Sequence, residues 1–440
     1  MMTGRRGNKG LMLLLCGSLA LVGCGHQASN GGGGNGPVTL AYWPAPNAQE
    51  VELADTVVKE WNRLHPGVLV SMQPIPVSQS TEEVLLAAIA GKTTPDICSN
   101  INPIALRDYI ASGGLMALDT FAGFDSVVGT RVPSHLLAAF RSPDGHFYQV
   151  PWKTNPVMMF YNLRLMHAAG VQNVPRTYGE YFALGDSVKR NLNHGPTMEI
   201  WMGERDIRPI WWQRMFDFYP FYLAASEGHP LFVGDSVAFG NAWAVDVFAF
   251  FQRCYERQYY PRTSFYQSVD PFLLEKKVSH IAGPWQVAAI KKFAPSLWYT
   301  VTPLPVPDTN SGPVYTFGDF KNIGIFTTTK HPREAWEFVS FMLSKAHDRM
   351  LLQLTDQIPV RGDLLTNPEF REYFRDHPRI LTFAEQVPYT RGMDSAPDMK
   401  EIFDGISQEF EMCSVYGTKT PLRGMTDAVA RARMIIEWNQ

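Results

Sequence analysis

The chain has 440 residues and a formal net charge of −3, with 39 basic and 42 acidic side chains and no basic stripe. This balance argues against nucleic acid as a partner, because nucleic-acid-binding domains concentrate positive charge on one face. Aromatic residues make up 12% of the chain and include 11 tryptophans, more than a plain scaffold needs. We therefore expect some of the tryptophans to contact a ligand.

The first 23 residues have the composition of a secretory signal peptide. Residues 1–9 are basic and contain no acid, and residues 11–22 form an almost wholly apolar run. About a dozen apolar residues is too few for a helix across a hydrocarbon core of roughly 30 Å, but suits the apolar segment of a signal. The run ends in Leu21-Val22-Gly23-Cys24, which resembles a bacterial lipobox. We expect cleavage before Cys24 and lipidation of that cysteine.

The next segment, residues 24–36, is rich in Gly, Ser, Asn and Gln and cannot bury apolar surface. It is predicted to be a flexible linker. Together with the lipidated Cys24, it predicts an exported protein that touches a bacterial membrane through its lipid anchor only. The body is expected in the periplasm or the extracellular space, and the kind of membrane stays open.

The folded body begins with alternating strands and helices. The patterns predict a strand at 38–43 (VTLAYW), a helix at 47–64, a strand at 68–72, a helix at 80–91 and a third strand entered at Pro95-Asp96-Ile97. This order implies a parallel α/β sheet with right-handed crossovers. Ligands of such sheets bind at the carboxyl ends of the strands.

The pattern changes near residue 155, after which helical periodicities dominate up to residue 293. A proline-rich segment follows at 301–313, and residues 324–328 are again strand-like. A helix is predicted from His331, with Pro332 near its first turn. The length is sufficient for two or more hydrophobic cores.

The cysteines of the body are Cys98, Cys254 and Cys413, an odd number without CxxC spacing. They indicate neither a disulfide framework nor a zinc ribbon, although one pair could form a disulfide.

Motifs of catalysis are weak. HExxH and GxSxG do not occur, and the sequence contains no phosphate-binding Walker motif. The tripeptides Gly185-Asp186-Ser187 and Gly234-Asp235-Ser236 are similar to the GDS of some esterases, but we interpret both as turns or caps. We expect no catalytic residues, no metal site and no cofactor.

Several short segments, taken in their order, carry a family resemblance. They are residues 91–97 (GKTTPDI), 147–162 (FYQVPWKTNPVMMFYN), 281–285 (IAGPW), 322–341 and 358–361 (IPVR). This order resembles the extracellular solute-binding proteins of bacterial ABC importers, the family that includes maltose-binding protein. The resemblance runs over nearly the whole body, with departures at Ser226-Glu227-Gly228 and Asn155-Pro156.

The resemblance implies a two-lobed periplasmic-binding-protein fold of type II, with three hinge crossings and the ligand in the interlobe cleft. The crossings are expected near residues 154–157, 299–304 and 326–330. Lobe 1 is expected to comprise 37–154 and 303–328, and lobe 2 to comprise 155–302 and 329–440. The implied partners are a carbohydrate and the permease subunits of an importer whose ATPase is a separate chain, and we expect a monomer.

A sugar offers a flat apolar ring face and a rim of hydroxyls, so its site needs aromatic side chains and fixed polar groups. Trp285 follows Gly283-Pro284, and the resemblance places a stacking tryptophan there. Trp43 ends the first strand, and cleft and core are equally open for it, whereas Tyr42 is expected to be buried on the other face. One of Trp211 and Trp212 is expected to face the ligand.

The other candidates are polar or lie beside a crossing. Asn100 and Asn102 bind hydroxyls or cap a loop. One of Trp152, Lys153 and Asn155 is expected to touch the ligand.

Phe317 and Asp319 flank Gly318, which permits close backbone approach. Asp319 binds two sugar hydroxyls or lies in a solvated turn, and Arg361 is a donor from lobe 2 or forms a surface ion pair. Trp61 and Trp336 lie on apolar helical stripes and are expected in the core.

These features predict a lipid-tethered protein that closes two lobes around a carbohydrate and delivers it to a permease. The same fold could bind glycerol phosphate, a polyamine or an oligopeptide instead. A phosphate needs Arg, Lys or a helix N-terminus, and a polyamine needs a ring of acids. A secreted carbohydrate-active enzyme is the remaining alternative.

Overall fold

The computed structural model describes residues 36–77, 80–205, 207, 211–263, 269–394, 396 and 398–438. The predicted signal peptide, Cys24 and all but the last residue of the predicted linker lie outside the described residues. Among the described residues, no helix has both the length and the apolarity that crossing a membrane requires.

A six-stranded sheet has the strand order β12-β4-β11-β3-β1-β2. Its strands are β1 (Val38–Trp43), β2 (Val68–Met72), β3 (Ile97–Ile101), β4 (Val150–Thr154), β11 (Lys321–Ile325) and β12 (Ile358–Pro359). Strand β1 lies parallel to β2 and β3, and β11 runs antiparallel to β3 and β4. Helices α1 (Ala48–Leu64) and α2 (Thr81–Gly91) connect the parallel strands, so the predicted strand and helix order is confirmed.

Helix α1 begins where its sequence provides a cap. The Asn47 side chain accepts a hydrogen bond from the Glu50 amide at 3.0 Å, and an apolar stripe that ends in Trp61 is buried. Helices α11 (Pro332–Met342) and α12 (Lys345–Thr355) pack against α1. Trp61 and Trp336 are only 2% and 5% exposed, which confirms that both lie in the core.

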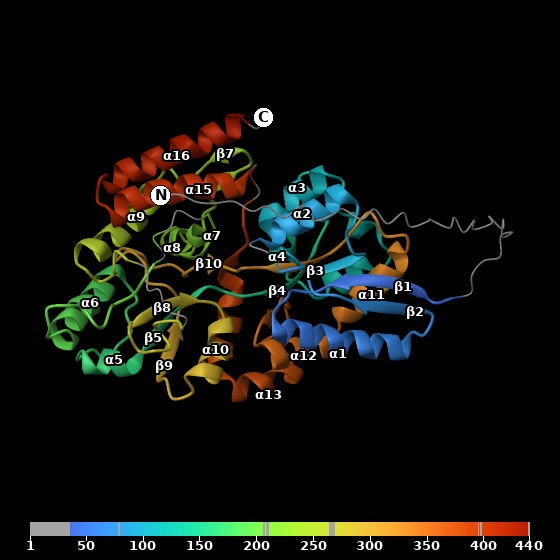
Figure 1. The fold of residues 1–440 in the computed structure, drawn as a ribbon, viewed down its shortest axis with the longest axis horizontal. Helices are drawn as coiled ribbons and strands as arrows, with labels where there is room; N and C mark the ends of the chain where they lie inside the picture. The colour runs from blue at the N-terminus through green and yellow to red at the C-terminus, as the bar shows by residue number, and fades with distance from the viewer. Residues whose placement is uncertain are drawn as a thin grey trace, which may run out of the picture. The chain divides into compact units, whose positions relative to one another are not determined.

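A second, three-stranded antiparallel sheet has the order β8-β5-β9, and Figure 1 shows these strands together near α10. Its strands are β5 (Met158–Asn162), β8 (Ser279–Ala282) and β9 (Tyr299–Thr302). Two-stranded sheets pair β6 (Phe232–Val233) with β7 (Ser236–Val237), and β10 (Thr316–Phe317) with β13 (Thr390–Arg391). The remaining α-helices are α3 (Leu106–Ala111), α4 (Ser134–Ala138), α5 (Leu163–Ala168), α6 (Tyr178–Leu192), α7 (Trp211–Phe216), α8 (Phe218–Ala225), α9 (Ala242–Glu256), α10 (Trp285–Phe293), α13 (Pro368–Asp376), α14 (Pro378–Gln386), α15 (Met399–Phe410) and α16 (Pro421–Trp438).

An aromatic core lies among α8, α9 and α15. Phe218, Phe251 and Phe410 are fully buried there, with ring centroids 5.1 Å apart for Phe251 and Phe410 and 6.3 Å apart for Phe218 and Phe410. Tyr181 and Tyr260 donate or accept hydrogen bonds inside the same core. Packing in this core therefore accounts for much of the aromatic excess that we had expected to serve ligand binding.

The chain passes from the six-stranded to the three-stranded sheet between β4 and β5, at residues 155–157. The Asn155 amide donates to the Gly318 carbonyl at 2.6 Å, and the Val157 amide donates to the Phe317 carbonyl at 2.9 Å. The segment between β9 and β11 therefore lies against this passage. The first crossing was predicted near residues 154–157.

The structure differs from the other predicted boundaries. Residues 299–302, predicted as a crossing, form β9 and pair with β5. Residues 326–330 lead into α11 and α12, which pack on α1, and β12 pairs with β4. Residues 332–359 therefore belong with the six-stranded sheet rather than with lobe 2, because they bury their apolar faces there. The chain returns to the three-stranded sheet only before α14, which packs on β9.

Candidate functional site

The polar part of the candidate site lies at the carboxyl edge of the six-stranded sheet. Strand β4 ends there, and its Lys153 lies opposite Lys321 of β11 and Pro359 of β12 in the strand register. The Lys153 ammonium group forms an ion pair with Glu50, which lies in the first turn of α1. Strand ends and a helix N-terminus thus bring opposite charges together at this edge.

Amide side chains extend the ion pair. Gln357 Nε2 donates to Glu50 Oε1 at 2.9 Å, and Asn155 Nδ2 donates to Gln357 Oε1 at 3.2 Å. Glu50 and Asn155 are 4% and 3% exposed, and within the described part of the chain Glu50 Oε2 and Asn155 Oδ1 have no hydrogen-bond donor. A buried acceptor without a donor is destabilising.

The charges at this edge neutralise one another. Burial alone would raise the pKa of Glu50, but the Lys153 charge and hydrogen bonds from Lys153, Gln357 and Asn47 hold it below its usual value. Burial would lower the pKa of Lys321, but Asp319, whose carboxylate lies 2.9 Å from the Lys321 ammonium group, raises it. The edge therefore presents two internal ion pairs and no net charge from these four groups.

The turn before β11 connects the polar edge with aromatic side chains. Thr154 Oγ1 donates to the Gly318 carbonyl at 2.6 Å, and a Cβ on Gly318 would lie 3.0 Å from that hydroxyl oxygen and 2.5 Å from the Phe320 ring. Asp319 follows in the left-handed region at φ 38° and is 5% exposed. The predicted close approach at Gly318 is present, but Asp319 is buried and ion-paired rather than in a solvated turn.

An aromatic row begins at Trp285, the first residue of α10. Its ring centroid lies 6.0 Å from that of Phe216 at an interplanar angle of 85°, and Phe216 lies 5.8 Å from Phe317. Trp285 is 38% exposed and Phe317 is 3% exposed. Because Phe317 adjoins Gly318, the row ends at the polar edge. Trp285 is thus the exposed end of an otherwise packed row.

The other predicted aromatics lie at different depths. Trp212 is 40% exposed, whereas Trp211 is half-buried, with the Lys400 ammonium group 5.5 Å from its ring centroid. Trp43 is half-buried and packs against the core that contains Phe317. Trp212 is therefore the more exposed of the two tryptophans.

The two predicted asparagines, one on β3 and one just after it, differ in burial and in hydrogen bonding. Asn102 is 7% exposed, its Oδ1 accepts from the Ile104 amide at 3.2 Å, and its Nδ2 donates to Glu82 Oε1 at 2.9 Å. These contacts correspond to the loop-capping alternative. Asn100 is half-buried on β3.

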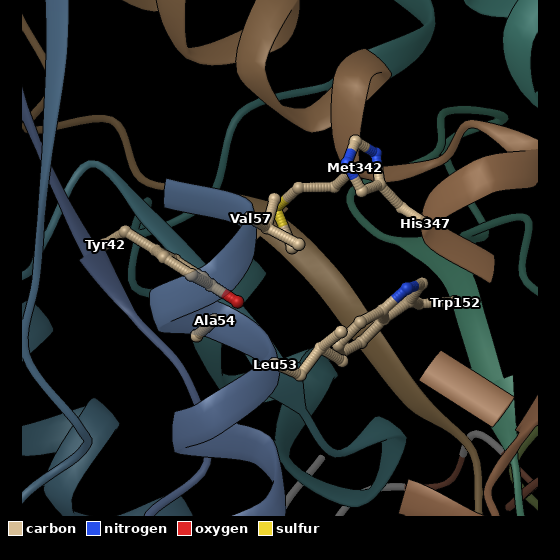
Figure 2. Close-up of a pocket in the computed structure, with 7 residues that line it drawn as sticks. All are labelled: Tyr42, Leu53, Ala54, Val57, Trp152, Met342 and His347. Carbon is tan, nitrogen blue, oxygen red and sulfur yellow. The ribbon is translucent and has the colours of Figure 1, made fainter. Parts of the chain in front are cut away.

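Trp152 lies in the core under α1 rather than at a ligand surface. It is 4% exposed and, together with Tyr42, lines a small, mainly apolar cavity against Leu53, Val57 and Met342 (Figure 2). Tyr42 is 1% exposed, as we expected, and donates to or accepts from Ser99 Oγ at 2.6 Å. Strand β4 is buried along its whole length, so a tryptophan on it packs inward.

Arg361 is also engaged inside the protein. Its guanidinium group donates to Asp348 at 2.9 Å and to Asp363 at 2.8 Å. Asp348 is fully buried and also accepts two hydrogen bonds from Arg131, which donates to the backbone carbonyls of β4. Neither predicted role of Arg361 matches this placement. The ion pair of Arg361 with Asp348 is buried, and Asp348 lies on α12, which packs beside the six-stranded sheet.

The turn that presents Trp285 is held by a charged cluster of Asp270, Lys277 and the β8 residue His280. Asp270 accepts from Gln286 Nε2 at 3.0 Å, and its oxygens lie 3.1 Å from the Lys277 ammonium group and 3.3 Å from His280 Nε2. Burial would raise the pKa of Asp270, but the neighbouring His280 and Lys277 lower it to about 2. Burial and Lys277 lower the pKa of His280 to about 3.

Stability is expected to fall with acidification because of His280. Its pKa of about 3 in the folded chain lies below the usual value near 6.5, so the unfolded state binds more protons as the pH falls from about 6.5 toward 3. Between pH 7 and pH 5 the wild type should lose about 1–2 kcal/mol more unfolding free energy than His280→Asn. Urea unfolding at both pH values measures this difference, and equal losses would contradict it.

The cysteines of the described chain, Cys98, Cys254 and Cys413, are buried free thiols, so the disulfide left open by the sequence is absent from the described residues.

Glu50 and Gln357 were not candidates from the sequence. The sequence contained a signal for Glu50, because an acid three residues after a capping asparagine lies at a helix N-terminus. It contained none for Gln357, which is far away along the chain.

Comparisons with known proteins show which family this chain is similar to. The profile of the bacterial extracellular solute-binding protein family matches residues 56–375. An arabinooligosaccharide-binding protein of Bacillus subtilis (strain 168) is 25% identical over 183 residues, which are 41% of this chain and 40% of that protein. The predicted family resemblance is confirmed.

Solved structures are similar over most of the chain. The sugar-binding protein MalE of Xanthomonas citri superposes with a TM-score of 0.74 at 17% identity, covering 91% of this chain and 98% of that one. UgpB of Mycobacterium tuberculosis, solved in complex with glycerophosphocholine, superposes with a TM-score of 0.75 at 19% identity, covering 92% and 100%. At these identities the likeness concerns the fold, and it confirms the predicted solute-binding α/β fold.

Proposed function

The chain belongs to the bacterial extracellular solute-binding protein family, and from this premise we propose that it binds a neutral carbohydrate and delivers it to the permease of an ABC importer. The single observation that carries the choice of ligand is the exposed Trp285 at the end of an aromatic row that meets a charge-neutral polar edge. The arabinooligosaccharide-binding relative and the sugar-binding structure of similar fold support the same class.

The aromatic row suits the apolar face of a sugar ring. Trp285 keeps 38% of its surface exposed while Phe216 contacts it edge to face. A partly exposed indole favours contact with a flat apolar surface, which a pyranose or furanose ring offers. Trp212, which is 40% exposed, is our second aromatic candidate.

The polar edge suits hydroxyl groups better than a phosphate. Lys153 pairs with Glu50, and Lys321 pairs with Asp319. A phosphate would have to compete with these carboxylates for its counter-charge. Glu50 Oε2 and Asn155 Oδ1, which are buried and have no donor among the described residues, would instead accept hydrogen bonds from hydroxyls once this edge opens to the ligand.

We propose that ligand binding closes the elements around the six-stranded sheet against the elements around the three-stranded sheet. Exposed ion pairs already link them: Arg107 of α3 lies 3.3 Å from Asp235, and Lys400 of α15 lies 2.7 Å from Glu83 of α2. A ligand that touches both groups would favour this closed arrangement, because only differential affinity shifts the equilibrium. The lipid anchor on Cys24, the monomeric state and release of the ligand without chemical change are parts of the same proposal.

A ligand panel tests the proposal. The soluble body, starting near residue 31, is heated with arabino- and malto-oligosaccharides, glycerophosphocholine, glycerol phosphate and spermidine. A neutral oligosaccharide at 100 times its Kd should stabilise the protein by about 2.7 kcal/mol and raise Tm. Stabilisation by a phosphate compound or by spermidine alone would contradict the choice of ligand. Shortened oligosaccharides after incubation would instead indicate an enzyme.

A further inference from the structure

Gly283 lies directly beneath the indole ring of Trp285. A Cβ built on Gly283 would overlap the six-membered ring at Cζ3, and it would lie 2.5 Å from Cε3 and 2.6 Å from Cη2. Carbon atoms do not approach so closely, so either the turn or the indole would have to move if residue 283 carried a side chain. One face of Trp285 therefore rests on the backbone of Gly283.

The turn itself is anchored at both ends. Before Gly283, Ala282 pairs with Met158 in the three-stranded sheet. After it, the Gln286 amide donates to the Gly283 carbonyl at 3.1 Å, and Gln286 Nε2 donates to Asp270 at 3.0 Å. These contacts hold the backbone of the turn on both sides of Gly283.

The conformation of Gly283 does not itself demand glycine. It is not among the residues with positive φ, so alanine is compatible with its backbone angles. The three atoms nearest to a Cβ at this position all belong to the Trp285 indole. An alanine should therefore leave the fold intact and displace the ring.

We infer that Gly283 is a positioning residue for ligand specificity: it lets the Trp285 indole lie flat on the backbone and offer its opposite face to a ring-shaped ligand. This inference rests on the proposed function, since it assumes that Trp285 contacts the carbohydrate. A β-carbon at position 283 lifts the indole into the space of the ligand. A ligand recognised in this way stacks on one face of the indole only.

The test uses Gly283→Ala, Trp285→Ala and the double variant. Gly67→Ala is the matched control, because nothing lies within 4 Å of a Cβ there and its φ is not positive. Calorimetric titration with the best oligosaccharide of the panel should give a Kd about tenfold higher for Gly283→Ala and unchanged for Gly67→Ala. Because Gly283 acts through Trp285, the double variant should bind no more weakly than Trp285→Ala.

A second readout needs no ligand. The Trp285 contribution to near-ultraviolet circular dichroism, taken as the difference from Trp285→Phe, should change in Gly283→Ala while Tm stays within a few degrees. Wild-type affinity in Gly283→Ala, or a further loss in the double variant, would overturn the inference. If no oligosaccharide binds the wild type, the proposed function fails, and an unchanged dichroism signal would still overturn the positioning role.

Discussion

Replacing Asp348 by alanine is expected to lower the free energy of unfolding by about 3–5 kcal/mol, because it removes the carboxylate that pairs with the buried Arg131 guanidinium group and one of the two carboxylates that pair with Arg361. Asp348 is fully buried, and Arg131 is 2% exposed. Arg131 donates to the carboxylate at 2.7 Å and 3.0 Å, and Arg361 donates to it at 2.9 Å. Arg131 also holds the carbonyls of Pro151 and Trp152, so the loss reaches β4.

Urea unfolding at pH 7 measures this loss. The control is Asp55→Ala, whose ion pair with Lys59 measures 2.6 Å but is exposed, and its effect should stay within about 0.5 kcal/mol. Asp348→Asn keeps one acceptor oxygen and should fall between the wild type and Asp348→Ala. A loss for Asp348→Ala as small as that of the control would show that the buried charges find other partners.

Replacing Trp285 by alanine is expected to weaken carbohydrate binding by about tenfold to a hundredfold, or about 1.4–2.7 kcal/mol. The indole is the exposed end of the aromatic row, and the substitution removes the surface on which a sugar ring would stack. Stability should change little, because the side chain is 38% exposed and lies at the first residue of α10.

Trp298→Ala is the control for this experiment. Trp298 is 47% exposed and contacts His167 edge to face at 4.7 Å, outside the aromatic row of Trp285. Titration of both variants with the same oligosaccharide should give a Kd within about twofold of the wild type for Trp298→Ala. Equal affinities for the two variants would remove Trp285 from the site.

Local patterns predicted the first part of the fold well. The apolar stripe of α1 and its asparagine cap identified the helix, and β1, β2 and β3 follow from short strand-like segments between the helices and turns. Trp61 and Trp336 were predicted in the core because helical spacing alone sets which face of a helix is buried. Gly318 was singled out because glycine permits close backbone approach, and the approach involves both the nearby Phe320 and the distant Thr154.

Long-range contacts explain most of what the sequence analysis missed. Strand β12 has two residues, one of them a proline, so nothing local indicated that residues 332–359 return to the first sheet. The pair of Glu50 and Lys153 and its partner Gln357 meet only after folding. Trp152 was one of three candidates for ligand contact, and Arg361 was predicted as a donor from lobe 2 or a surface ion pair. Their burial was missed because the burial of β4 and of Asp348 depends on elements far away in the chain.

Recovery of a bound ligand tests the central claim most directly. The purified soluble body is mixed with a pool of neutral oligosaccharides and phosphodiesters, separated from free solutes and denatured, and the released compounds are identified by mass spectrometry. We predict one intact neutral oligosaccharide per chain, retained by the wild type and lost from Trp285→Ala. Retention of a phosphodiester, or of no carbohydrate at all, would contradict the account.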